Sequence, residues 1–90
     1  MFKVDTSKEA LDLANKSDFG LAATIFTEDL DKIEMAEKSL RTGSVFVNAC
    51  VVAGSEYPGG GIKGSGIGRE CYSDGVLDIA NRKTIIRRKP

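Results

Sequence analysis

Two cysteines are the residues whose chemistry could be nucleophilic or metal-binding. Cys50 and Cys71 lie 21 positions apart, and no other cysteine accompanies them, so the paired spacing of a zinc site or a CxxC redox motif is missing. The sequence has no histidine, which excludes Ser–His and Cys–His catalytic pairs and zinc sites with histidine ligands. Each cysteine is therefore interpreted as a small packing or surface residue.

Three glycines follow the spacing of a dinucleotide-binding loop. Gly59, Gly61 and Gly64 match GxGxxG, but they do not lie directly between a strand and its helix. Lys63 is followed by glycine rather than by Ser or Thr after a Gly-Lys pair, so it does not complete a phosphate-binding P-loop. We interpret the glycines as a tight backbone crossing where a Cβ would collide, and Lys63 as a surface residue or an anchor for an anion.

One pair of carboxylates has the spacing of a single helical turn. Glu70 and Asp74 could act together as acid and base, since residues four apart on a helix are neighbours. A solvated helix face is the simpler interpretation. No catalytic residue and no metal ligand are assigned.

The composition indicates one small domain. Ninety residues with 41% hydrophobic and 29% charged side chains can form a single thin core. No run approaches the ~18 apolar residues of a membrane span, and the first residues do not resemble a signal peptide. Two cysteines and no signal favour a reducing compartment, so we expect a cytoplasmic protein without a membrane partner.

Charge is distributed unevenly along the chain. Residues 1–40 hold five lysines and nine acids, whereas residues 41–90 hold eight basic residues and four acids. Five of the last nine residues are Lys or Arg. No aromatic residues interleave with them as stacking partners, so nucleic acid binding is not expected.

Apolar spacing predicts alternating helices and strands. Thr6 and Glu9 have the spacing of a capping box before a helix of about ten residues. Residues 21–26 are predicted as a buried strand, and Thr27 as the cap of a second helix. Residues 44–47 predict a second buried strand. This order is typical of an α/β layer with parallel pairing.

The second half is predicted to be less regular. Residues 49–68 hold seven of the ten glycines and are interpreted as an irregular loop. A helix over residues 69–80 is expected to bury four apolar side chains, and residues 83–88 alternate like a terminal strand. The four side chains are those of Val76, Leu77, Ile79 and Ala80.

Five segments, in order, resemble the C-terminal portion of the aldehyde dehydrogenase superfamily. They are residues 10–15 (ALDLAN), 19–27 (FGLAATIFT), 43–48 (GSVFVN), 58–70 (PGGGIKGSGIGRE) and 81–86 (NRKTII). Among these NAD(P)-dependent enzymes, the chain is most similar to succinate-semialdehyde dehydrogenases. The resemblance implies an α/β fold, a small, parallel-type, three-layer fragment of the catalytic domain. Within a single domain, residues 1–80 would form this part and residues 82–90 a C-terminal oligomerisation strand.

The resemblance also implies what these residues do not do. Complete family members oxidise an aldehyde to a carboxylic acid with NAD or NADP, using a cysteine thiolate and a glutamate that activates water. Those two residues and the cofactor domain precede the matched region. The ninety residues alone are therefore expected to bind no cofactor and to be inactive, as a C-terminal fragment of such an enzyme.

A substrate-entrance loop is the site that the resemblance implies. It would contain Asn48, Ser55, Pro58 and Gly59. Gly59 stands where most members have phenylalanine, a loss of roughly 150–250 Å² of ring surface. The position that matches the carboxylate-binding serine of succinate-semialdehyde dehydrogenases is Ala53, and Ser55 is out of register.

The end of the chain is implied to contact another subunit, through Thr84, Ile85, Ile86 and Arg87. An unpaired strand edge invites pairing with another chain. We expect a homodimer or higher homo-oligomer, or association with the remainder of a split dehydrogenase. The alternative function is a free-standing interaction module that pairs with itself or with full-length dehydrogenase subunits.

Overall fold

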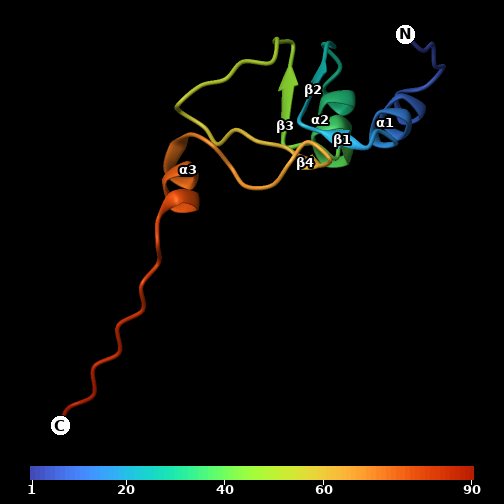
Figure 1. Cartoon of the computed structure of the whole chain (residues 1–90). Helices are drawn as coiled ribbons and strands as arrows, with labels where there is room; N and C mark the ends of the chain where they lie inside the picture. Colours follow the sequence, from blue (N-terminus) through green and yellow to red (C-terminus); the bar gives the residue numbers. More distant parts are fainter.

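A pair of parallel strands forms the centre of the molecule, in a computed structural model that describes all ninety residues (Figure 1). β2 (Ala22–Ile25) pairs with β3 (Ser44–Val47). The helix α2 (Leu30–Ser39) connects them and packs against β3. The predicted α/β class and parallel pairing are confirmed. The prediction that both strands are buried was wrong, because every residue in them is only half-buried.

The capping box at the first helix is confirmed in part. α1 (Ser7–Asn15) begins after Thr6, whose Oγ1 accepts a hydrogen bond from the Glu9 amide at 3.1 Å. The Glu9 carboxylate reaches back, but it accepts from the amide of Asp5 (3.1 Å) rather than from that of Thr6. One N–H group of the first helical turn and one N–H group just before the N-cap are therefore satisfied by side chains.

The N-cap of the second helix lies two residues later than predicted. Asp29, not Thr27, is its N-cap, and Asp29 Oδ1 accepts from the amides of Asp31 (3.1 Å) and Lys32 (3.2 Å). The side chain and the amide of Lys32 hold the pKa of Asp29 below its ordinary value. Thr27 instead accepts from the amide of Asp29 (3.2 Å), so it stabilises the turn that leads to the cap.

A second, two-stranded sheet was missed by the sequence patterns. β1 (Phe19–Gly20) pairs antiparallel with β4 (Ile62–Lys63). The prediction of residues 49–68 as loop without strand was wrong at β4. Two residues give no alternation to detect, and their partner lies more than forty positions away.

Glycines allow the loop that carries β4 to cross other backbone segments at close range. A Cβ on Gly43 would lie 1.7 Å from the carbonyl oxygen of Gly60. One on Gly61 would lie 2.6 Å from a loop side chain, and one on Gly64 would lie 2.9 Å from the carbonyl oxygen just before β1. The predicted crossing is confirmed at these two motif positions. It was wrong at Gly59, where an added Cβ would meet nothing within 4 Å.

The last helix and the tail extend away from this body (Figure 1). α3 (Tyr72–Ile79) begins three residues later than predicted. All four apolar side chains expected to be buried there are exposed, including Val76 at 62% and Ile79 at 88%. Residues 80–90 form no helix or strand, so the predicted terminal strand has no partner within this chain.

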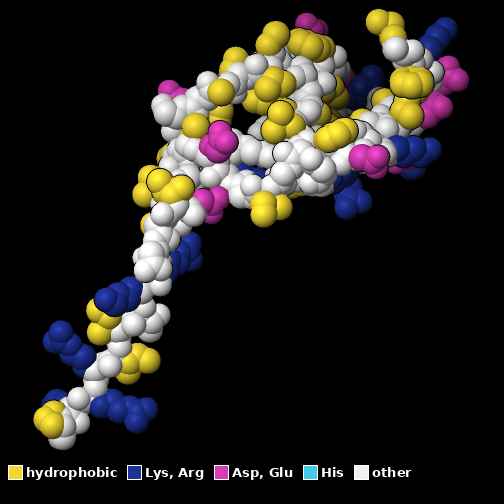
Figure 2. All heavy atoms as spheres, viewed as in Figure 1, with side chains coloured by type: hydrophobic (Ala, Val, Ile, Leu, Met, Phe, Trp, Pro, Cys, Tyr) yellow, Lys and Arg dark blue, Asp and Glu magenta, His cyan; other side chains and the backbone are white.

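Little of the chain is buried. Gly20, Ala36 and Gly61 are the three buried residues. The accessible surface is 7637 Å², whereas a folded chain of this mass exposes about 5,100 Å². The radius of gyration is 18.1 Å, against about 12 Å for a compact domain of this length. Apolar side chains are accordingly spread over the surface in Figure 2.

None of the helices combines the length and the apolar character needed to span a bilayer.

The backbone crossing predicts a large effect of alanine at one glycine and a small effect at another. Gly43→Ala should lower the free energy of unfolding by about 3 kcal/mol, since backbone must move to admit the methyl group. Gly59→Ala should change it by less than about 0.5 kcal/mol, because its site is open. Urea unfolding followed by circular dichroism measures both. Equal effects at the two positions would contradict the crossing.

Candidate functional site

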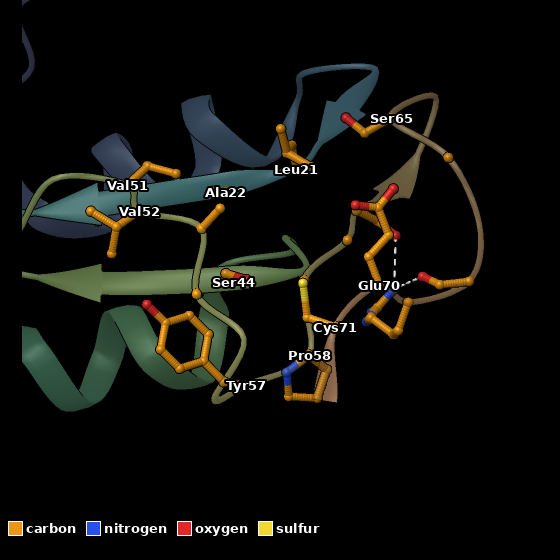
Figure 3. A pocket seen from close by; sticks show the side chains of 18 of the residues that line it. Leu21, Ala22, Ser44, Val51, Val52, Tyr57, Pro58, Ser65, Glu70 and Cys71 are labelled. Atoms are coloured by element: carbon orange, nitrogen blue, oxygen red, sulfur yellow. Dashed lines mark hydrogen bonds between the residues drawn. The ribbon is translucent and has the colours of Figure 1, made fainter. Parts of the chain in front are cut away.

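A hollow of about 390 Å³ lies between the parallel strands and the glycine-rich loop (Figure 3). Ala22 and Ser44, the first residues of β2 and β3, line it. Val51, Val52 and Tyr57, from the segment that follows β3, line it as well. The volume falls within the range of small-molecule pockets. This pocket is the candidate site.

Two of the four residues predicted for a substrate entrance line this pocket. They are Pro58 and Gly59. Asn48 and Ser55 are not among its lining residues, and Asn48 lies directly after β3. The absence of a side chain at Gly59 leaves that part of the wall open. Ala53 also lines the pocket, and its side chain offers no hydroxyl.

Lys63 fixes the loop to the first helix. Its Nζ donates hydrogen bonds to the carbonyl oxygens of Asn15 (2.9 Å) and Ser17 (3.0 Å). A cation there complements the negative end of the helix dipole of α1. Both interpretations made from the sequence were wrong, because the ammonium is neither a free surface group nor available as an anchor for an anion. Only the fold brings it to carbonyls 46 and 48 positions away.

Arg69 and Asp78 hold the far side of the pocket together. The Nη1 of Arg69 donates to the carbonyl oxygens of Gly61 (3.0 Å) and Gly68 (2.7 Å). Its amide donates to Oδ2 of Asp78 in α3 (2.7 Å). The sequence patterns predict no role for either side chain. The neighbours of a single arginine in the sequence do not indicate which backbone carbonyl oxygens its side chain will contact in the folded chain.

The residues considered for catalysis do not form a reactive group. Cys50 and Cys71 are both free and exposed, and Cys71 lines the pocket. Glu70 precedes α3, and its amide and carbonyl pair with those of Gly59 at 2.7 and 2.9 Å. Glu70 and Asp74 are exposed, as predicted, but the prediction that they share a helix face was wrong, because only Asp74 lies in α3.

The glycine motif does not fit a dinucleotide. A phosphate cradle needs backbone N–H groups that point at the ligand. The amide of Gly59 donates to Glu70, and that of Gly64 donates to the carbonyl oxygen of Asp18 (2.9 Å each). The ammonium group of Lys63 already donates hydrogen bonds to the carbonyl oxygens of Asn15 and Ser17. No group of three or more Cys, Asp or Glu residues lies close enough to hold a metal ion.

The sequence of the chain matches a known protein family. The "Aldehyde dehydrogenase family" profile matches residues 1–85. The chain belongs to the aldehyde dehydrogenase family. The predicted resemblance is confirmed, and the chain corresponds to a small part of these dehydrogenases.

Individual aldehyde dehydrogenases show how small the matched part is. The chain is 40% identical over 90 residues to the human mitochondrial aldehyde dehydrogenase, 100% of this chain and 17% of that protein. It is 38% identical over 85 residues to a succinate-semialdehyde dehydrogenase [NADP(+)] of Deinococcus radiodurans, 94% and 18% of the two chains. The chain therefore spans less than one fifth of these relatives.

A solved structure gives the same result for the fold. The chain superimposes on the succinate-semialdehyde dehydrogenase of Burkholderia pseudomallei with a TM-score of 0.81 and 34% identity. The match covers 86% of this chain and 16% of that one. The α/β arrangement described above thus exists as part of a larger aldehyde dehydrogenase structure.

The contacts of Lys63 predict a specific loss of stability. Lys63→Met should lower the free energy of unfolding by about 1–2 kcal/mol, because two charge-assisted hydrogen bonds are lost while the apolar stem is kept. Lys8→Met removes an exposed ion pair with Asp12 and should have no measurable effect. Urea unfolding compares the two. An unchanged midpoint of urea unfolding for Lys63→Met would contradict a stabilising role of its hydrogen bonds to the end of α1.

Proposed function

We propose that these residues form the aldehyde-entrance wall and a subunit contact of an NAD(P)-dependent aldehyde dehydrogenase. The observation that carries the proposal is the open pocket between the parallel strands and residues 49–71, in a chain that matches this family over residues 1–85. Cys50 and Cys71 are not assigned as the nucleophile. That role, and cofactor binding, fall to polypeptide outside the ninety residues.

The exposed surface supports association with further polypeptide. The chain exposes about 2,500 Å² more than a compact domain of its mass. Interfaces of permanent complexes bury about 2,000–5,000 Å² in total. Seventeen large hydrophobic side chains are exposed, among them Leu21, Val51 and Ile67. The molecule therefore has the apolar surface of a portion of a larger subunit more than that of a self-sufficient module.

Succinate semialdehyde is the first substrate that we propose to test. Relatives from Deinococcus radiodurans and Burkholderia pseudomallei carry that activity in their names. Ala53 in the pocket wall supplies no hydroxyl for the substrate's carboxylate, so an uncharged aldehyde of similar length is the necessary comparison. A preference for the uncharged aldehyde would contradict the proposed substrate, but it would not contradict the proposal that the complete enzyme oxidises aldehydes.

A chimeric enzyme tests the entrance-wall function. Residues 1–85 replace the matched segment of the Deinococcus radiodurans enzyme, with which they share 38% identity. The chimera should keep aldehyde oxidation within about tenfold of the parent, a change of about 1.4 kcal/mol in barrier. Formation of NAD(P)H, followed by absorbance, measures it. The same chimera with Gly43→Ala should lose activity together with stability.

The isolated chain is the control for this experiment. It should show no NAD or NADP binding in calorimetry at micromolar concentration and no aldehyde turnover. A chimera that folds and assembles like its parent but remains inactive would contradict the proposal, as would turnover by the pure ninety residues.

The subunit contact predicts an effect of proline in the tail. Ile86 is 81% exposed in a segment that has no partner within the chain. If residues 84–87 pair with another subunit, Ile86→Pro removes a backbone donor and should shift the chain from dimer or larger toward monomer. Ile86→Val keeps the donor and should leave the assembly intact. Sedimentation velocity that shows the same species for both variants would rule out this contact.

A further inference from the structure

Asn48 continues the pairing of the two parallel strands with its side chain. The backbone N–H of Asn48 donates a hydrogen bond to the carbonyl oxygen of Ile25 at 2.8 Å. Its side-chain Oδ1 accepts from the amide of Thr27, and its Nδ2 donates to the carbonyl oxygen of Thr27, both at 2.8 Å. The side-chain amide thus bonds to both backbone groups of Thr27 and extends the hydrogen bonding between the two strands beyond their last paired residues.

The backbone of Asn48 turns away while its side chain stays paired. Its φ is 52°, in the left-handed region that asparagine tolerates better than most residues. The chain therefore leaves the sheet at this residue and runs into the segment whose Val51 and Val52 line the pocket (Figure 3).

The segment that follows has no other attachment by hydrogen bonds. Residues 49–58 form a turn at residues 55–56, but none of them makes a hydrogen bond to a strand or to α3. The next fixed point is the Gly59–Glu70 pair. This ten-residue segment, six of whose residues line the pocket, is therefore held by hydrogen bonds only at its two ends, and one of these ends is Asn48.

We propose that Asn48 is a positioning residue for the pocket wall, acting through the hydrogen bonds between its side-chain amide and the backbone of Thr27. The family resemblance implies only that Asn48 belongs to a substrate-entrance loop, and it assigns no contact to the side chain. Its oxygen and one amide proton are already engaged, and it does not line the pocket. The inference concerns the order of the wall, and it holds whether or not the pocket admits an aldehyde.

Asn48→Gly is the principal variant, because glycine accepts the positive φ and removes only the side-chain amide. NMR on the ninety-residue chain gives two measurements. The Thr27 amide should exchange with solvent about tenfold faster, since its acceptor is lost. The backbone order parameters of residues 50–54 should fall from about 0.85 toward 0.6 or below.

A second asparagine provides the matched control. Asn15 is bonded in the same two-sided way, with Nδ2 donating to Ser39 (2.7 Å) and Oδ1 accepting from Arg41 (2.8 Å). Asn48→Asp and Asn15→Asp both replace the donating NH₂ group by a charged oxygen at neutral pH. The first should loosen residues 50–54, and the second should leave them ordered.

The outcomes show whether the hydrogen bonds between Asn48 and Thr27 order the pocket wall or only bond the two residues to each other. Loss of order in the wall for Asn48→Gly and Asn48→Asp, but not for Asn15→Asp, supports the proposal. Faster exchange at Thr27 with unchanged order parameters at residues 50–54 would overturn it, as would equal loosening by Asn15→Asp. A wall that is mobile in the unsubstituted chain would overturn it too. Each of these results leaves the chimera experiment unaffected.

Discussion

The close passage of Gly43 beneath the loop at Gly60 is the constraint on which the rest of the structure depends. A Cβ at Gly43 would come within 1.7 Å of the carbonyl oxygen of Gly60, so the two backbones meet where no side chain fits. That approach sets β4 beside β1 and brings Lys63 to the end of α1. It also closes one side of the pocket. A molecule with so small a core is therefore organised by contacts between backbones more than by packing of side chains.

Local signals allowed α1, β2 and β3 to be predicted, whereas the pairing of β1 with β4 and the contacts of single side chains with distant backbone could not be. The capping box at Thr6 and the apolar run before Thr27 depend on neighbours within four residues, and they located α1 and β2. The roles of Lys63 and Arg69 depend on carbonyl oxygens that only the folded chain brings near. The burial of α3 was mispredicted for another reason. Its apolar residues suit a surface that the ninety residues do not supply.

The family relationship explains why the molecule has so much exposed apolar surface. Its relatives are more than five times longer than the segment that they share with it, which is 17–18% of their length. A portion of a larger subunit retains the local structure of its elements, because caps and strand pairs are internal to it. α3 and the tail, by contrast, are exposed, because no other part of the ninety residues covers them. The substrate, the cofactor, self-association and a cytoplasmic location remain predictions.

The sparse attachment of residues 49–58 has an evolutionary consequence. Since no hydrogen bond ties these residues to the sheet or to α3, exchanges, insertions and deletions there leave the surrounding scaffold intact. Lengthening such a span is cheap, because doubling a flexible loop costs only about 0.6 kcal/mol in closure entropy. Descendants of one ancestral gene could thus diversify the mouth of the pocket while inheriting an unaltered frame.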